Sequence, residues 1–333
     1  DPDSQFADDD VFATGPVVPE LAATFERYWA APLAIPVQAL QSRRATGRAA
    51  AREVLERRTP PQKAAHAGLD YQAKLAAGEP LTGLLSGSLP LVWARTEVVC
   101  DSPDKGAKIA RGERVSSLLF PAVAAAIRAT RTELELVTPY LVPTPDELRL
   151  IEEPRQPPRR VRILTTSLEA NNDPLAQAGY SRYRPSLLAS GAELYELRAR
   201  PQSRRGTGQS ARLSRHGNFS LHAKLLAFDR SGVFVGSMNL DQRSRLLNTE
   251  DGLIIHSAEL AEETARRFAA MTSPENAYAV ALQTEPGDSH RRRLTWTTVE
   301  DGKPLTLTRE PARSPWQRVQ GWILSLVHID REL

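Results

Sequence analysis

Strand-like and helix-like segments alternate along this 333-residue chain from residue 91 to residue 271. Strands rich in β-branched and other apolar residues are expected at 91–99, 134–138, 161–166, 193–197, 221–228, 233–235 and 253–256. Amphipathic helices are expected between them at 115–130, 173–190 and 258–271, with Asp173 capping the second helix and Gly191 ending it. Alternation of this kind is typical of α/β folds, so the sequence predicts an αβα sandwich built on a mixed sheet.

The chain before residue 91 has a different character. Residues 9–17 predict a short strand that ends in a turn, and Pro19 begins an amphipathic helix that runs to about Trp29. Residues 38–79 are rich in Ala, Arg, Lys and Glu, which predicts solvent-facing helices that connect two halves of the protein.

Two more elements are expected after residue 275. Residues 276–312 predict a small β-hairpin appended to the sandwich, with Asp301-Gly302 as its turn. Residues 315–327 carry Trp316, Trp322 and aliphatic residues that suit an amphipathic helix. Such a helix either docks on the protein's own core or lies at a bilayer interface, and composition favours docking.

Composition narrows the function classes without choosing among them. No run of 18 apolar residues occurs, so no transmembrane helix is expected, and the acidic first ten residues do not resemble a secretory signal peptide. The single cysteine, Cys100, cannot form an internal disulfide and is expected to be buried near a strand end. A net charge of +3 is compatible with anionic lipid and with nucleic acid.

One cluster of residues carries the chemistry. His222-Ala-Lys224 is followed by Asp229 and by Gly236-Ser237-Met238-Asn239, which gives the pattern H-x-K-x(4)-D-x(6)-G-S-x-N. A chain of this length contains the pattern by chance in roughly one case in 10⁵ to 10⁶. Two residues apart on a strand, His222 and Lys224 are expected to point to the same face.

Phosphodiester chemistry suits these residue types. Lys224 can neutralise phosphate oxygens, and His222 can attack phosphorus or protonate a leaving oxygen near neutral pH. The Ser237 hydroxyl and Asn239 can donate hydrogen bonds to phosphate. Asp229 is expected to have a structural or orienting role. Each residue taken singly has an ordinary structural interpretation, and the functional interpretation depends on the spacing of the whole set.

A working histidine needs a partner that holds its other ring nitrogen. Glu250, in Asn248-Thr249-Glu250, is the candidate, and a surface carboxylate at a strand start is the alternative. None of the other histidines has a lysine two residues further on, and no pair has metal-ligand spacing, so we expect neither a metal nor a cofactor.

The pattern resembles the HKD motif of the phospholipase D superfamily. Segments at 139–143, 161–165, 178–183, 193–197 and 236–244, and the ending Trp322–Ile329, are similar to the second half of bacterial cardiolipin synthases. The resemblance implies phosphatidyl transfer through a phosphohistidine on one histidine, with a second histidine protonating the leaving alcohol. It also implies that Glu250 orients the histidine of the motif.

Family members carry two HKD motifs, and this sequence contains one. The opening Asp8–Val18 resembles the stretch that follows the first motif, so we expect one complete repeat plus the remnant of a first repeat. The expected organisation is a remnant at 1–36, a helical connector at 37–90, the HKD half at 91–275 and a hairpin with an amphipathic tail at 276–333. Activity would then need a homodimer or a separate N-terminal half, because one histidine cannot act as both nucleophile and acid.

The substrate class follows partly from the resemblance. It implies an anionic, phosphatidylglycerol-like phospholipid and a peripheral location at the inner membrane of a bacterium. Six arginines in 198–215, with no acidic residue among them, are expected near the mouth of the site, where they would attract head groups or a nucleic-acid backbone. A solvated loop is the alternative. Few aromatic residues interleave with them, which disfavours nucleic acid. A phospholipase D-type hydrolase, a single-motif dimeric nuclease and a non-catalytic fragment remain open.

Overall fold

The computed structural model describes residues 4–36, 79–113, 119–154, 156–199, 218–285 and 288–325. The chain divides into two compact units, apart from its first residues. One comprises Asp3–Leu21 and Val92–Leu333, and the other comprises Ala22–Leu91. The first of these units holds the sheets and all of the candidate site residues. Within the described ranges, no helix is long and apolar enough to cross a membrane.

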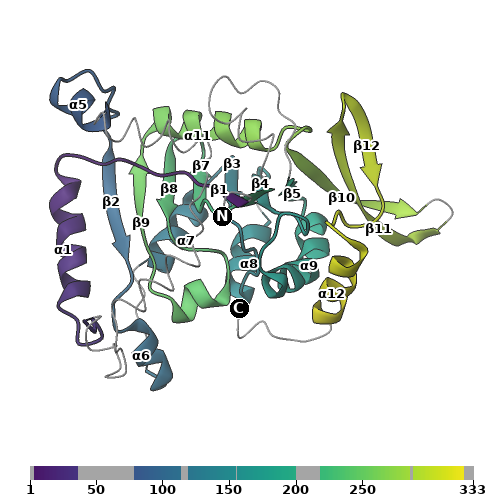
Figure 1. Cartoon of the computed structure of the whole chain (residues 1–333), viewed down its shortest axis with the longest axis horizontal. Helices are drawn as coiled ribbons and strands as arrows, with labels where there is room; N and C mark the ends of the chain where they lie inside the picture. Colours follow the sequence, from purple (N-terminus) through teal and green to yellow (C-terminus); the bar gives the residue numbers. More distant parts are fainter. Residues whose placement is uncertain are drawn as a thin grey trace, which may run out of the picture. The chain divides into compact units, whose positions relative to one another are not determined.

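Among the described residues, ten strands form the main sheet, in the order β12-β11-β10-β5-β4-β3-β7-β8-β9-β2 (Figure 1). They are β2 (Arg95–Cys100), β3 (Glu133–Val137), β4 (Arg160–Thr166), β5 (Glu193–Leu197), β7 (Leu225–Phe228), β8 (Gly232–Gly236), β9 (Asp251–His256), β10 (Ala277–Glu285), β11 (Asp288–Glu300) and β12 (Lys303–Leu307). β3, β4 and β5 are parallel, and the other pairings are antiparallel. The expected α/β fold with a mixed sheet is therefore confirmed.

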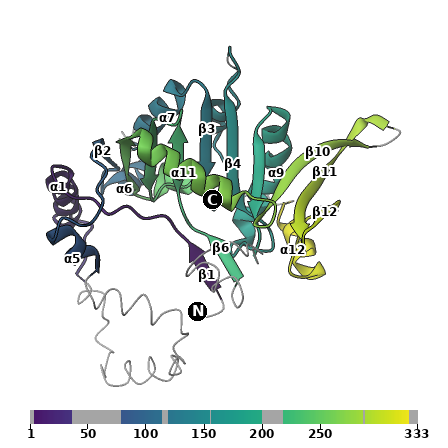
Figure 2. The same ribbon diagram turned by 90° about the horizontal axis from the view of Figure 1, so that it is seen from above.

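Helices cover both faces of this sheet (Figure 2). Alternate strand residues such as Leu136 and Ile163 pack with α7 (Leu119–Ala129), α8 (Pro145–Glu152) and α9 (Pro174–Ala189). The strand residues that point to the other face of the sheet pack with Phe268 and Ala261 of α11 (Ala258–Met271). As expected, Asp173 caps α9 by accepting hydrogen bonds from two backbone amides. Gly191 follows α9 at φ 92°, a value that favours glycine.

The N-terminal strand lies earlier than predicted. β1 is Ser4–Ala7, and residues 8–14 are irregular, so the strand expected at 9–17 is wrong. The turn is at Gly15, whose φ is 84°, and α1 (Val17–Trp29) follows it as expected. β1 pairs in parallel with β6 (Asn218–Leu221) to form a second, two-stranded sheet. The N-terminal segment thus reaches the strand that leads into the motif.

The single strand expected at 221–228 is two strands. β6 ends at Leu221 and β7 begins at Leu225, so the intervening residues 222–224 belong to neither. The backbone N–H groups of His222 and Ala223 both donate to the Ala7 carbonyl, at 2.9 and 3.1 Å. These bonds hold the first residues of the motif against the N-terminal segment, just before the chain enters the main sheet at β7.

The C-terminal region extends the main sheet. Instead of a two-stranded appendix, β10, β11 and β12 form three antiparallel strands, and β10 also pairs with β5. Asp301 and Gly302, both at positive φ, make the expected turn. The expected terminal helix is α12 (Pro315–Ser325), and its predicted last two residues lie outside the described residues.

Several elements were not predicted from the sequence: α5 (Glu79–Leu85), α6 (Lys105–Ala110), α8, and the short π-helix η1 (Arg243–Leu247). The first expected strand begins four residues late, at Arg95, and buried Cys100 is its last residue. The connector expected at 38–79 lies outside the described residues except for its last position.

Candidate active site

The motif residues gather at one edge of the main sheet. β3, β4 and β5 end at this edge, and antiparallel β7 begins there, with Leu225 opposite Val137. β8 ends and β9 begins at the same edge, where Gly236 lies opposite Gly252. The connections that hold residues 222–224 and 237–250 therefore meet at this edge, which we call the site edge.

His222 is held by a carboxylate from the N-terminal segment. Its Nδ1 lies 2.8 Å from Oδ2 of Asp8, and about half of the imidazole surface is exposed. Glu250, which was expected to hold this ring, accepts from the Ser237 hydroxyl in this structure, and Asp8 is the carboxylate at Nδ1. With Nδ1 engaged, Nε2 is the nitrogen suited to attack or protonate a phosphodiester. The acidic run at 8–10 was the one sequence signal for Asp8, and it is separated from His222 by 214 positions.

Lys224 places a buried positive charge beside His222. The side chain is 8% exposed, and its Nζ donates to the His222 carbonyl at 2.5 Å. Burial lowers the pKa of Lys224, although the nearby carboxylates of Asp8, Glu250 and Asp241 oppose that effect. Within the described residues the ammonium forms no ion pair, so a phosphate oxygen would meet a poorly neutralised cation.

The Ser237 hydroxyl is already engaged. Its Oγ donates to Oε2 of buried Glu250 at 2.5 Å and accepts from the backbone N–H of Asp251 at 3.0 Å. The expectation that this hydroxyl donates to phosphate is therefore not supported, since its one proton points to Glu250. Glu250 and Ser237 instead tie together the two ends of the connection between β8 and β9.

A buried ion pair supports the same connection. Lys105 Nζ lies 2.5 Å from Oδ2 of Asp101, and both side chains are 1% exposed. Asp101 Oδ2 also accepts from the backbone N–H of Glu250, and Lys105 donates to the Ser244 carbonyl. This pair fixes the backbone on either side of residues 245–249, and it was not predicted from the sequence.

Asn239 carries a buried side-chain oxygen that lacks a hydrogen-bond partner among the described residues. This atom is Oδ1, whereas the backbone N–H of Asn239 donates to the Ser244 hydroxyl at 3.1 Å. An unpartnered amide oxygen in the connection at the site edge suits a site that completes its hydrogen bonds with a ligand. Nearby, burial raises the pKa of Asp241 to about 6, despite hydrogen bonds from Ser244 that lower it.

Close backbone approach explains the glycine of the motif. A Cβ at Gly236 would collide with the Asp251 carbonyl and come within 2.9 Å of the Gly252 Cα. The Phe234 ring occupies the remaining space, 2.7 Å from the same position. Gly236 therefore lets β8 and β9 approach each other at the site edge.

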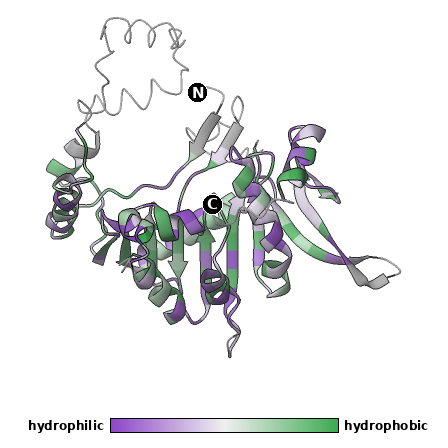
Figure 3. Cartoon of the chain, turned by 90° about the horizontal axis from the view of Figure 1, so that it is seen from below, coloured by the Kyte–Doolittle hydropathy of each residue, from purple (hydrophilic) through white to green (hydrophobic). Residues whose placement is uncertain are grey.

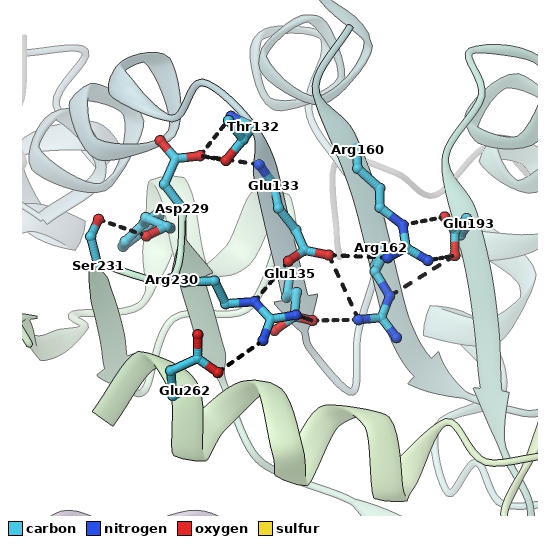
Figure 4. A network of polar contacts seen from close by, with 11 residues as sticks. Thr132, Glu133, Glu135, Arg160, Arg162, Glu193, Asp229, Arg230, Ser231 and Glu262 are labelled. Carbon is cyan, nitrogen blue, oxygen red and sulfur yellow. Dashed lines mark hydrogen bonds and ion pairs between the residues drawn. The ribbon is translucent and has the colours of Figure 1, made fainter. Parts of the chain in front are cut away.

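Asp229 lies at the opposite edge of the sheet, after the end of β7 (Figure 4). Its carboxylate accepts hydrogen bonds from the backbone N–H groups of Arg131, Thr132 and Glu133 and from the Thr132 hydroxyl. Burial opposes ionisation, but these bonds outweigh it and lower the pKa of Asp229. Asp229 therefore joins β7 to the start of β3.

The arginine-rich segment is only partly described. Arg198 is buried, and its Nη1 donates to the Thr298 hydroxyl and the Val299 carbonyl, so it does not stand at the mouth of a site. The remaining five arginines, at 200–215, lie outside the described residues. No group of three or more potential metal-ligating side chains occurs in the part of the chain that the structure describes.

Comparison with known proteins identifies the family. The family described as "Cardiolipin synthase, PLD-like domain" matches residues 123–272, which include every motif residue named above. Cardiolipin synthase C of Escherichia coli (strain K12) is 33% identical over 327 residues, which make up 98% of this chain and 66% of that protein. The chain belongs to the phospholipase D superfamily.

Two further similar proteins match smaller parts of this chain. Cardiolipin synthase A of Cronobacter sakazakii is 31% identical over 149 residues, 44% of this chain and 26% of that protein. The crystal structure of phosphatidylserine synthase from Haemophilus influenzae Rd KW20 is 15% identical, covers 58% of this chain and 41% of that one, and has a TM-score of 0.40. The chain thus spans less than two thirds of each of these proteins.

Proposed function

We propose that this chain supplies one catalytic half of a phosphatidyltransferase site of the cardiolipin synthase type. The observation that carries the proposal is the geometry of His222, whose Nδ1 is held by Asp8 while its ring remains half exposed beside buried Lys224. The family match and the 33% identity to cardiolipin synthase C support the lipid substrate.

The first step of the proposed reaction forms a phosphohistidine. Nε2 of His222 attacks phosphorus, a P–N bond forms and the P–O bond to the leaving alcohol breaks. Asp8 stabilises the positive charge that develops on the ring, and Lys224 and Asn239 bind the non-bridging oxygens. In the second step a lipid hydroxyl attacks, the P–N bond breaks and the phosphatidyl group is transferred.

A second acid is needed to protonate the leaving alcohol. The sequence contains one H-x-K-x(4)-D pattern, so we propose that the second imidazole comes from another HKD half. A second copy of this chain or another part of the whole protein could supply it. One imidazole, that of His222 or its counterpart, would carry the phosphatidyl group, while the other would protonate the leaving alcohol in the first step and deprotonate the attacking hydroxyl in the second.

The surroundings of the site suit a lipid. Leu246 and Leu247, in the connection that follows Asn239, are 42% and 47% exposed, and they offer apolar contacts beside the phosphate-binding groups. We propose a phosphatidylglycerol-like substrate and a peripheral position on the inner membrane of a bacterium. With water in place of the lipid hydroxyl, the same site would act as a phospholipase.

Incubating this chain, alone and together with any second HKD half of the whole protein, with phosphatidylglycerol vesicles tests the proposal. We expect cardiolipin and glycerol as products and an acid-labile phosphoryl adduct on His222 after rapid quenching. The variant His222→Asn should form neither product nor adduct, while His256→Asn, a matched control at another sheet position, should behave as the parent. Turnover that survives in His222→Asn would contradict the assignment, and cleavage of plasmid DNA without lipid turnover would favour a nuclease.

A further inference from the structure

Helix α12 docks on the protein with its polar face. Gln317 Nε2 donates to the Leu168 carbonyl at 2.7 Å, and Arg318 Nε donates to the Glu310 carbonyl at 2.7 Å. Gly321 approaches the Leu168 side chain. Just before the helix, Ser314 accepts from the backbone N–H of Gln317, which makes Ser314 an N-cap ahead of Pro315. The inward face of α12 thus anchors it mainly through hydrogen bonds.

The large apolar side chains of α12 point away from the protein. Trp316, Val319, Trp322 and Ile323 are 69%, 43%, 64% and 48% exposed. Their spacing of three, six and seven residues from Trp316 places them on one face of the helix. Figure 3 shows hydrophobic positions on this helix at the rim of the molecule. A helix that only stabilised the fold would bury its apolar face against the protein. In α12 this face is turned to solvent instead.

This outward face lies at the site edge. Leu168 and Glu169, to which α12 and the preceding Arg313 are bonded, follow the end of β4 at Thr166. β4 ends at the same edge of the sheet as the motif residues. Figure 2 accordingly shows α12 and the β1–β6 pair projecting from the same edge. A surface that bound the apolar face would lie alongside His222.

Positive charge accompanies the apolar face on the helix itself. Arg313, just before α12, donates to the Glu169 carbonyl, and Arg318, within it, donates to the Glu310 carbonyl. Among the described residues, neither arginine forms an ion pair with a carboxylate. No acidic residue occurs within α12. The surroundings therefore complement a negatively charged surface.

We propose that the face formed by Trp316, Val319, Trp322 and Ile323 inserts into the interface of an anionic phospholipid bilayer. Indole rings favour the head-group region because each combines an apolar body with an N–H donor. The flanking arginines would contact the phosphates. This inference rests on the proposed function only for the nature of the substrate; it adds the surface that would bring the site edge to the lipid.

Vesicle co-sedimentation of the full chain tests this surface. Trp316→Ser with Trp322→Ser should weaken binding to vesicles containing phosphatidylglycerol by roughly tenfold or more. Trp93→Ser is the matched control, because Trp93 is 74% exposed and lies outside α12, and it should bind like the parent. Replacing both α12 tryptophans with tyrosine should retain most of the binding, which excludes misfolding as the cause of the loss.

The arginines provide a second measurement. Arg313→Gln with Arg318→Gln, which keeps donors for the two carbonyls, should weaken binding to phosphatidylglycerol vesicles by roughly fivefold per charge and leave binding to phosphatidylcholine vesicles nearly unchanged. Equal binding by the parent and the double Trp→Ser variant would overturn the proposal. So would loss of binding in Trp29→Ser alone, or a dimer that the double variant abolishes while vesicle binding persists.

Two variants separate this surface from the proposed chemistry. His222→Asn should bind vesicles normally and turn over nothing. The double Trp→Ser variant should lose vesicle turnover but retain turnover of a monomeric short-chain phosphodiester. Turnover in His222→Asn would refute the proposed chemistry alone, while normal vesicle binding by the double variant would refute the surface alone.

Discussion

The two edges of the main sheet differ in how their charged groups are paired. At the edge where β3 and β4 begin, Glu133 accepts from Arg230 at 2.8 Å and Glu135 accepts from Arg162 at 2.6 Å, beside the fourfold hydrogen-bonded Asp229 (Figure 4). At the site edge, buried Lys224 bonds only a carbonyl among the described residues, and Asn239 Oδ1 has no partner there.

The difference separates stability from binding. Charges that are paired within the protein stabilise the fold. Buried polar groups without partners destabilise it, and a ligand that supplies the missing hydrogen bonds offsets this loss of stability. We therefore expect substitutions of the unpaired groups at the site edge to remove activity at little cost in folding free energy, and substitutions of the paired charges at the far edge to do the reverse.

Lys224→Met should give the largest effect and the sharpest test of this comparison. Activity should fall by roughly 10³-fold, because the variant loses the cation that stabilises the transferring phosphate. The free energy of unfolding should stay unchanged or rise by up to about 1 kcal/mol, because a desolvated charge is removed. Steady-state kinetics and urea denaturation measure the two quantities, with exposed Lys303→Met as the control. A large loss of stability would contradict the comparison.

Asp229→Ala should show the opposite behaviour. It removes the acceptor of four hydrogen bonds at a residue whose φ is 49°, so unfolding should become easier by about 3 kcal/mol. Asp229→Asn keeps an acceptor and tolerates this backbone conformation, so we expect a loss of about 1 kcal/mol. Activity per folded molecule should be retained in both variants. Since the folded-state pKa of Asp229 is lowered, its contribution is present above the usual pKa of 3.8 and is lost as pH falls through the folded value.

Local patterns in the sequence predicted much of the fold. Short segments rich in apolar residues predicted β3, β4 and β5 nearly to the residue, and the cap of α9 at Asp173 followed from its side chain and the following Pro174. These elements are determined by residues close together in the chain. The His222–Lys224 pair was also found from local spacing, which its position at one sheet edge supports.

Long-range contacts account for the errors. The break at 222–224 depends on hydrogen bonds to the Ala7 carbonyl, and Asp8 replaces Glu250 beside His222 for the same reason. No periodicity in the sequence records a pairing between segments more than 200 positions apart. The reversed orientation of α12 was equally hidden, because an amphipathic pattern fixes which residues share a face but not which face docks.

Asp241→Asn tests the site edge by pH. Burial raises the folded-state pKa of Asp241 from 3.8 to about 6, so its stabilising contribution is present below pH 3.8 and is lost as pH rises through about 6. Between about pH 4.5 and about pH 7.5 the parent should lose about 2 kcal/mol through this group, at 1.36 kcal/mol per pKa unit. The variant should not show this loss. Urea midpoints at the two pH values give the difference, and identical pH dependence in parent and variant would show that Asp241 carries no such penalty.

Asp8→Asn should give the smallest effect. It tests whether Asp8 serves activity, like Lys224, or stability, like Asp229. Asp8 contacts the ring of His222 rather than the substrate, so kcat should fall by roughly tenfold to a hundredfold while KM is nearly unchanged. Stability should change by less than about 1 kcal/mol, because both partners are about half exposed. The matched control is Asp10→Asn, which lies three positions after Ala7, the residue whose carbonyl accepts from the His222 backbone N–H. If Asp8→Asn instead unfolds the protein while turnover per folded molecule is retained, Asp8 belongs with Asp229 as a structural carboxylate, and the site edge is not reserved for the ligand.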